Sequence, residues 1–362
     1  MKRARPRSVV KTSAGSLLLG KMPRGCQLCI RGTKLVLFVT GLCRSGCFYC
    51  PLSEKRRWKD IVYANERQVK SSREITEEAT MMGALGTGIT GGDPIMRFNR
   101  ALGHIRLMKK KFGRKHHIHM YCCTPLSTEK LRKLKKVGLD EIRFHLWSAK
   151  PVKLALDAGI NAGVELPAIP GDYNKLVSFL KELDETPGVF VNLNELEFSD
   201  TNLKSFKKRG FRLRAETSMA VKGSQELALK ILKWAATNTR LNIHYCPSSL
   251  KDSVQLKNRL KRRAVRVAKP YEQVTDEGLL FKGVITGVAP GRLASLRRRL
   301  IKRHGIDPKL LGLDIQKKRI ELHWRLAQAL SKVESALDFA LVEEYPTHDR
   351  LETTMIPLAK SV

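Results

Sequence analysis

Short β-rich runs alternate with longer helical stretches between residue 34 and about residue 195. Because the runs are apolar along most of their length, the alternation predicts a parallel sheet covered by helices. Six such units are too few for the eight repeats of a closed barrel, so we predict an α/β fold with a partial, TIM-like (β/α)6 barrel. The expected strands are 34–40, 87–90, 116–123, 140–146, 163–169 and 188–193, and the expected helices include 73–85, 101–112 and 127–138.

The alternation loosens after residue 195. The pattern predicts a helix at 224–238, a strand at 241–246 and a very basic helix at 249–268. The strands and helices expected after Pro270 are typical of a separate small α+β domain. The sequence thus predicts a basic N-terminal arm with a CxxC motif (1–33), the partial barrel with its extension (34–269) and the small α+β domain (270–362).

The composition favours a cytoplasmic protein. No apolar run is long enough for a transmembrane helix, and the N-terminal residues lack the apolar core of a secretory signal, so no membrane partner is expected. In a reducing cytosol, clustered cysteines act as metal ligands or redox groups rather than as disulfides. The 8 cysteines are therefore candidates for metal or redox chemistry.

Three of the cysteines stand in the stretch CRSGCFYC, with the spacing CxxxCxxC. Cys43, Cys47 and Cys50 at these offsets fit a tight loop that holds three corners of a [4Fe–4S] cluster and leaves one iron open for a substrate or cofactor. Structural zinc is the alternative, although it more often takes four ligands from paired CxxC units. The motif follows the expected strand 34–40, so we expect the cluster at the C-terminal end of a barrel strand.

Two motifs in this order resemble those of the radical S-adenosylmethionine (SAM) superfamily. The first is the cluster signature CxxxCxΦC, in which Φ is aromatic, and the second is a GGEP-like turn after the second strand. The resemblance covers about residues 30–200, and it looks closest to archaeal proteins related to the activating enzyme of pyruvate formate-lyase. The matching residues are Cys43, Cys47, Tyr49 and Cys50 in the first motif and Gly91, Gly92, Asp93 and Pro94 in the second.

This resemblance implies a reaction and a set of cofactor contacts. SAM would chelate the open iron, and one electron from the cluster, supplied by a donor such as ferredoxin or flavodoxin, would split SAM into methionine and a 5′-deoxyadenosyl radical. Tyr49 would lie against the adenine, and Gly91 and Gly92 would allow a close approach to the methionine amine. Asp93 stands where Glu is more frequent, and its carboxylate is one methylene shorter. Further candidate SAM contacts at strand ends, each of which also fits an ordinary core or rim residue, are Thr124, His145 and Glu165.

The other cysteines suggest the hypothesis of a second metal site. Cys26 and Cys29 form a CxxC motif upstream of the first strand, while His244 and Cys246 share one face of the strand expected at 241–246. Together the four side chains make a Cys₃His set that suits a structural zinc ion or an auxiliary iron–sulfur cluster. Alternatively, the CxxC is an isolated turn with two free thiols, and Cys246 belongs to the core.

Cys122 and Cys123 end the third expected strand, near the predicted SAM pocket. Buried cysteines commonly act as small apolar residues, and a hydrogen-atom donor or an auxiliary ligand is the alternative. The nearby histidines are not expected to bind a metal, since His117 and His119 share one strand face and His116 lies opposite.

The formal net charge of +34 suggests a polyanionic partner. Lysines and arginines cluster in residues 1–53, which contain no acidic residue, and again in 257–269 and 296–303. We therefore predict that the enzyme modifies RNA, with tRNA as the leading candidate. The alternative is a protein-modifying or glycyl-radical-activating enzyme of the pyruvate formate-lyase activase type. Aromatic residues near the expected barrel mouth that suit stacking on RNA bases are Phe48, Trp58 and Trp147.

Overall fold

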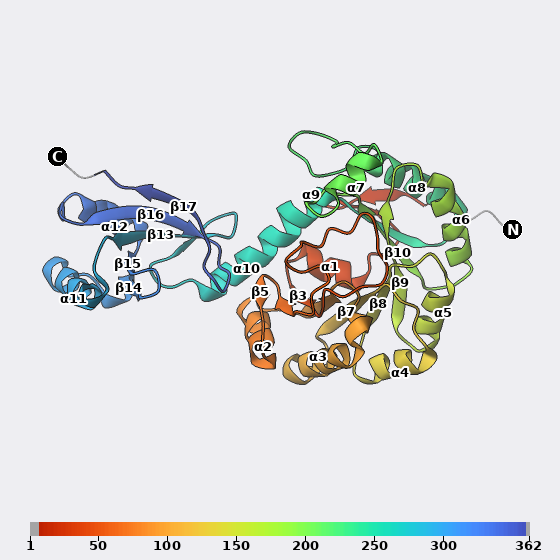
Figure 1. Ribbon diagram of the computed structural model, residues 1–362, viewed down its shortest axis with the longest axis horizontal. Helices are drawn as coiled ribbons and strands as arrows, with labels where there is room; N and C mark the ends of the chain where they lie inside the picture. The colour runs from red at the N-terminus through yellow and green to blue at the C-terminus, as the bar shows by residue number, and fades with distance from the viewer. Residues whose placement is uncertain (1–6, 360–362) are drawn as a thin grey trace. The chain divides into compact units, whose positions relative to one another are not determined.

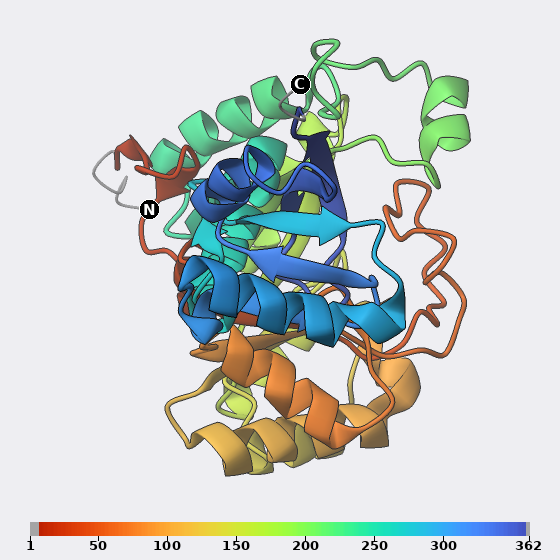
Figure 2. The same ribbon diagram turned by 90° about the vertical axis from the view of Figure 1, so that its left-hand side faces the viewer.

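The structure is a computed structural model, and it describes residues 7–359. The chain forms two compact units, which Figures 1 and 2 draw from two directions. The first unit contains the chain up to Leu256 apart from residues 81–83, which belong to the second unit with the chain from Lys257 onward. Among the described residues, none of the helices combines the length and the apolar content that a membrane crossing needs.

A single open sheet forms the centre of the first unit. Within the described residues seven of its strands run parallel, in the order β11–β10–β9–β8–β7–β6–β3. The sequence predicts six of them as barrel units; the seventh, β11, is expected only in the extension, so the count of six is one too low. The bounds are β3 (Lys34–Phe38), β6 (Gly86–Thr90), β7 (His117–Cys122), β8 (Glu141–Phe144), β9 (Asn161–Ala168), β10 (Phe190–Glu195) and β11 (Asn242–Cys246).

Short antiparallel strands cover both edges of this sheet, so the parallel strands do not close into a complete barrel. Strands β2 and β1 follow β11 at one edge, and β4 and β5 follow β3 at the other. Covered edges leave fewer unpaired backbone groups on the parallel strands. The bounds are β1 (Val9–Lys11), β2 (Leu17–Leu19), β4 (Tyr63–Ala64) and β5 (Arg67–Gln68).

Helices lie outside the sheet and connect its parallel strands (Figure 1). Helix α4 illustrates why they form: the Ser127 side chain accepts a hydrogen bond from the Lys130 amide at the N-terminus, and Leu131 and Leu134 are buried one turn apart. Three of these helices, α5, α6 and α7, are not among those expected from the sequence. The bounds are α2 (Ser72–Met81), α3 (Phe98–Phe112), α4 (Thr128–Lys136), α5 (Lys150–Asp157), α6 (Tyr173–Asp184), α7 (Leu203–Lys208), α8 (Ser224–Asn238) and α9 (Ser248–Leu250), with a 3₁₀ turn at Pro94–Arg97 and a π-helical stretch at Lys251–Leu256.

The N-terminal segment is built into the first unit. Helix α1 (Arg24–Ile30) carries the CxxC motif, so the two cysteines lie on a helix and not in an isolated turn. The sheet curves around α1, as Figure 1 shows, and the Gly25 amide donates to the Glu141 carboxylate at 3.2 Å. A Cβ at Gly25 would lie only 2.6 Å from the His119 ring, so glycine permits this close approach. Of the segment expected as a basic arm, α1 therefore lies inside the curve of the sheet, while β1 and β2 extend its edge.

In the described residues, the second unit is an antiparallel sheet with three helices. It begins at Lys257, whereas the sequence analysis places the start of the small α+β domain at residue 270, because the basic helix before Pro270 belongs to this unit and not to the barrel. Its strand order is β14–β15–β13–β16–β17, and β12 pairs with β13. The bounds are β12 (Gln273–Val274), β13 (Leu280–Thr286), β14 (Leu311–Asp314), β15 (Arg319–Leu322), β16 (Asp338–Glu344), β17 (Glu352–Pro357), α10 (Lys257–Val267), α11 (Leu293–His304) and α12 (Trp324–Ser331), with 3₁₀ turns at Pro290–Arg292 and Pro308–Leu310.

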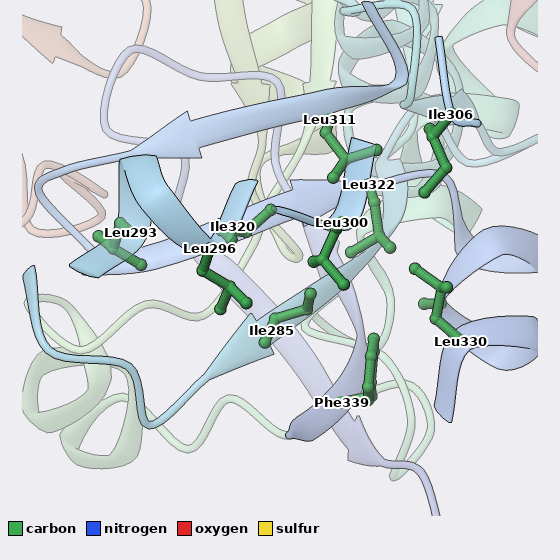
Figure 3. Packing of buried hydrophobic residues seen from close by; sticks show 11 residues of the cluster. Ile285, Leu293, Leu296, Leu300, Ile306, Leu311, Ile320, Leu322, Leu330 and Phe339 are labelled. Carbon is green, nitrogen blue, oxygen red and sulfur yellow. The ribbon is translucent and has the colours of Figure 1, made fainter. Parts of the chain in front are cut away.

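One face of this second sheet packs on α11 and α12 through an apolar core (Figure 3). Leu296 and Leu300 of α11 lie one turn apart, which places both on the buried side of the helix. They pack with strand residues that point to the same face, among them Ile285, Ile320 and Phe339.

Charged side chains alternate with these core residues and point to the opposite face of the second sheet. Lys282 is almost completely buried, and its Nζ lies 2.6 Å from Glu321, 2.8 Å from Glu344 and 3.0 Å from Glu272. Arg319 is equally buried and also pairs with Glu321, at 2.9 Å. The ion pairs compensate the burial of several charges within one network.

Candidate functional site

The CxxxCxxC cysteines lie on the loop that follows β3, at the C-terminal end of a parallel strand as predicted. Cys43, Cys47 and Cys50 are free, half-buried thiols, and the Cys50 amide donates to the Cys47 carbonyl at 3.1 Å in a tight turn. Gly46 has a φ of 59°, a conformation that favours glycine. The loop thus presents three thiols on a compact backbone at the end of the sheet where (β/α) barrels place their chemistry.

The GGDP turn follows β6, the neighbour of β3, and packs on the base of the cysteine loop. The Gly92 amide donates to the Thr40 carbonyl at 2.8 Å, and the Asp93 amide donates to the Leu42 carbonyl at 2.8 Å. A Cβ at Gly91 would clash with the Thr40 carbonyl oxygen, and one at Gly92 would lie 2.5 Å from the Leu42 carbonyl oxygen. The sequence analysis assigns both glycines to the approach of SAM; in the structure they also allow the turn to touch the loop that carries the cysteines.

We expect Gly92→Ala to lower the free energy of unfolding of the first unit by about 1–3 kcal/mol, the usual cost of overpacking. Because Gly92 does not have a positive φ, the effect is a steric one against the Leu42 carbonyl. The variant should also retain less iron after anaerobic reconstitution, since the turn must move away from the cysteine loop. Thermal unfolding and iron analysis measure these two effects.

Gly103→Ala is the matched control, because Gly103 lies in α3 and a Cβ there would meet no atom within 4 Å. Alanine at this position should stabilise the helix by up to about 1 kcal/mol. If the two variants unfold alike and hold equal amounts of iron, the packing argument for the GGDP turn is wrong.

Two of the candidate SAM residues, Asp93 and Thr124, bind each other. The Thr124 hydroxyl donates to one oxygen of Asp93 at 2.6 Å, and the Ile95 amide donates to the other oxygen at 3.2 Å. Asp93 is 1% exposed and caps the 3₁₀ turn that Pro94 begins. The shorter carboxylate thus reaches partners within the protein and fixes the GGDP turn to the end of β7.

Tyr49 and His145, also candidate SAM residues, form a second connection across the site. The Tyr49 hydroxyl lies 2.7 Å from Nε2 of His145, and Nδ1 of His145 lies 2.7 Å from the backbone oxygen of Glu165. A carbonyl oxygen only accepts, so Nδ1 carries a hydrogen; burial lowers the pKa of His145, and the neutral ring then accepts the Tyr49 proton at Nε2. These bonds tie the aromatic residue of the cysteine loop to strands β8 and β9.

The Glu165 carboxylate faces the interior of the sheet and is bound by several side chains. Arg143 donates to it at 3.2 Å, Asn192 at 2.8 Å and Asn194 at 2.7 Å. The structure therefore brings Glu165 close to the other candidate SAM residues through its backbone, while its side chain takes part in a polar network below them.

Cys123 lies beside the cysteine loop, next to Cys43. A hydrogen bond with the Cys123 thiol lowers the pKa of Cys43 to about 6, while the same bond raises the pKa of Cys123. The bond favours the thiolate form of Cys43, and the thiolate is the form of cysteine that binds metals. The donor set of the loop fits a [4Fe–4S] cluster. Cys122, by contrast, points away, is buried and donates to the Thr124 carbonyl at 2.9 Å, as a small core residue would.

The segment after β10 also touches the cysteine loop, which the sequence analysis did not anticipate. Thr201 donates from its hydroxyl to the Cys50 carbonyl at 3.0 Å, and the Asn202 amide group donates to the Tyr49 carbonyl at 3.3 Å. Phe48 of the loop packs near Phe206 of α7, with ring centroids 6.1 Å apart. The only signal for this contact in the sequence is three phenylalanines between residues 198 and 211. They form an apolar cluster with Phe48 and Tyr49 of the loop.

The four residues of the predicted second metal site lie on α1 and β11. Cys26 is buried, 3.3 Å from Arg143, and both ring nitrogens of His244 lack a hydrogen-bond partner among the described residues. Cys26 and Cys29 are close enough to Cys246 to raise its pKa further, beyond the effect of burial. In residues 7–359, however, no three His, Cys, Asp or Glu side chains are gathered around one point as metal ligands, and this includes the CxxxCxxC loop. The second site stays a prediction, which the zinc and iron content of the purified protein tests.

Comparison with known proteins identifies the region of the cysteine and GGDP motifs. Residues 37–163 match the radical SAM superfamily, and residues 278–358 match a domain of unknown function, DUF8061. A curated protein of Methanocaldococcus jannaschii, provisionally named a glycyl-radical enzyme activating enzyme, is 38% identical over 356 residues and covers 93% of each chain.

Two solved structures with similar chains are distant from this chain in sequence. SuiB of Streptococcus suis bound to S-adenosylmethionine has a TM-score of 0.43 at 12% identity, over 60% of this chain and 51% of its own. Methylornithine synthase has a TM-score of 0.40 at 13% identity, over 59% of this chain and 71% of its own. The near full-length relative and the two motifs decide the assignment: the chain belongs to the radical SAM superfamily of enzymes, which use a [4Fe–4S] cluster and SAM.

Proposed function

We propose that the chain is an activating enzyme that modifies a partner protein by installing a glycyl radical. The observation that carries this proposal is the relative from Methanocaldococcus jannaschii, which is 38% identical over 93% of both chains. Its name describes a glycyl-radical enzyme activating enzyme. The match extends through both units of the chain. It therefore includes the C-terminal unit as well as the unit with the cysteine loop.

This proposal takes the alternative from the sequence analysis and sets aside RNA as the first choice. The RNA prediction rests on the net charge of +34, but acidic proteins are also attracted to a basic surface. Several of the cations counted in that charge are buried in ion pairs, among them Arg143, Lys282 and Arg319. Some cations of helix α10 are also unavailable for binding RNA phosphates, since Arg262 donates to the Gly83 carbonyl at 2.9 Å and Arg263 is buried.

We assign the cofactor contacts of this proposed activity to the residues at the C-terminal ends of β3 to β9. Cys43, Cys47 and Cys50 would bind three irons of the cluster. The side chains proposed to border SAM are joined in pairs, Asp93 with Thr124 and Tyr49 with His145, so each pair would hold its members in place before SAM binds. The cluster, when bound and reduced, supplies the single electron that cleaves SAM for hydrogen-atom abstraction from the substrate.

The test is the formation of 5′-deoxyadenosine by the reconstituted, dithionite-reduced enzyme with protein or RNA fractions of its own cells. Under the proposal, a protein fraction stimulates the reaction, and a glycyl radical becomes visible by electron paramagnetic resonance. Protease treatment should remove the stimulation and ribonuclease should not. Stimulation that survives protease and is lost with ribonuclease would return the assignment to RNA modification.

A further inference from the structure

The exposed side of α7 and of the residues that follow it is basic and partly apolar. Residues 203–213, LKSFKKRGFRL, contain five lysines and arginines and no acidic residue. Leu203 is 39% exposed and Leu213 is 41% exposed. We call the exposed side chains of this stretch the α7 surface. Among the described residues none of its cations has an ion pair; these cations are Lys204, Lys207, Lys208, Arg209 and Arg212.

The same stretch and the two residues before it contact the cysteine loop directly. Asn202, immediately before α7, is bound to the Tyr49 carbonyl, and Thr201 is bound to the carbonyl of the cluster ligand Cys50. The Arg209 guanidinium lies over the Phe48 ring at 4.1 Å from its centroid. Figures 1 and 2 both place α7 beside this loop. A protein bound to the α7 surface would therefore be separated from the loop only by this thin layer.

We propose that the α7 surface is the docking site of the protein that reduces the cluster, a small acidic iron–sulfur or flavin protein. The reaction at this site is the transfer of one electron: the reduced partner loses it, the oxidised cluster gains it, and no bond forms or breaks. Docking sites of electron-transfer proteins are small, and charge complementarity gives them fast association. The inference depends on the cluster but not on which substrate the enzyme modifies.

The chemistry of the α7 surface fits a protein better than a nucleic acid. Exposed Leu203 and Leu213 offer apolar contacts between the cations, as protein interfaces require. Recognition of single-stranded RNA uses exposed aromatic rings for stacking, but Phe206 is buried and Phe211 is half-buried against other rings. An acidic protein is therefore the occupant that the surface favours.

The experiment measures the rate at which the reconstituted, oxidised enzyme is reduced, without any substrate. An acidic reduced ferredoxin and dithionite serve as the two reductants, and the cluster absorbance is followed by stopped flow. The variant K204E/K207E/K208E should be reduced by ferredoxin about tenfold more slowly at low ionic strength. Its reduction by dithionite should be unchanged. Added salt should slow the ferredoxin reaction of the wild type and have little effect on the variant.

The control variant K110E/K111E/K115E changes the net charge equally, at the exposed C-terminal end of α3 just before β7 begins. It should be reduced by ferredoxin at close to the wild-type rate at low ionic strength. The milder K204Q/K207Q/K208Q should lose less than the glutamate variant, in proportion to the smaller charge change.

Three results would overturn the proposal. If ferredoxin reduces both glutamate variants equally slowly, the effect comes from the net charge of the enzyme and not from the α7 surface. If dithionite reduces K204E/K207E/K208E as slowly as ferredoxin does, the substitutions act through the packing of α7 on the cysteine loop and not through docking. Unchanged ferredoxin reduction together with lost tRNA binding or lost protein-dependent turnover would assign the α7 surface to the substrate instead. The reduction assay contains no substrate. An error in the proposed glycyl-radical activity would therefore produce neither of the first two results.

Discussion

Cys43→Ala is expected to leave the enzyme without its cluster: iron should fall from about four atoms per chain to less than about one. The loop offers three thiols, and a cube that is bound at only two corners is easily lost. Cleavage of SAM should fall below detection, because no reduced cluster is present to supply the electron. Iron and sulfide analysis, the visible absorbance and the yield of 5′-deoxyadenosine measure these effects.

Cys122→Ala is the matched control for this variant. Cys122 is buried and bonded to the Thr124 carbonyl, outside the cysteine loop, so its removal should cost about 1 kcal/mol and leave the cluster in place. A Cys43→Ala protein that keeps about four irons and cleaves SAM would contradict the assignment of the ligands. Zinc or iron that remains bound to a Cys43→Ala protein unable to cleave SAM would instead support the predicted second metal site at Cys26, Cys29, His244 and Cys246.

Lys282→Met is expected to destabilise the second unit by about 3–5 kcal/mol, the cost of breaking a buried ion pair from one side. The substitution removes the cation that three buried carboxylates share and leaves Glu321 and Glu344 close together. Hydrogen exchange of the β13 and β16 amides in the full chain measures the effect on this unit. Lys302→Met is the control, since Lys302 is exposed on α11, and it should change stability by less than about 0.5 kcal/mol.

The same network predicts a dependence on pH. Burial alone would raise the pKa of Glu321, but Lys282 and its other cationic neighbours lower it well below the usual range, and they lower the pKa of Glu344 as well. A carboxylate with a lowered pKa stabilises the fold above its unfolded pKa, about 4.3, and this contribution is lost as the pH falls further. The difference between Lys282→Met and the wild type should therefore shrink below about pH 4. A difference that stays constant down to pH 2 would contradict the role of these ion pairs.

Local patterns in the sequence predict most of the first unit. Apolar runs give the parallel strands, and Ser127 and Gly138 bracket α4 as helix-terminating residues do. Helix α1 is not predicted, because RGCQLCI has only seven residues and spans only about two helical turns, too few to show a repeating apolar pattern. Its two cysteines also suggest a metal-binding turn. The strand β11 is predicted as a strand, but no local pattern assigns it to the parallel sheet.

The candidate site is predictable to the extent that it lies in contiguous motifs. The cysteine loop and the GGDP turn are each visible as a short string of residues. The bond from Tyr49 to His145 joins residues from different strand ends, and Thr201 reaches Cys50 from a segment with no motif of its own. Such contacts depend on how the strands are arranged in the sheet, which the sequence pattern alone does not supply. The net charge misleads for the same reason, because a count of cations does not reveal that Arg143 and Lys282 are buried.

The pairing of β2 with β11 has a consequence for the order of folding. Leu19 pairs with Ile243, and the Arg7 guanidinium donates to the Leu241 carbonyl at 2.8 Å, so β2 cannot complete its pairing until β11, the last strand of this unit along the described chain, has been synthesised. Contacts between such distant parts of a chain form slowly. During this interval α1 lacks the finished sheet that encloses it, and its cysteines are accessible to metal ions and oxidants. Anaerobic conditions during synthesis should therefore protect this enzyme even before it has received a cluster.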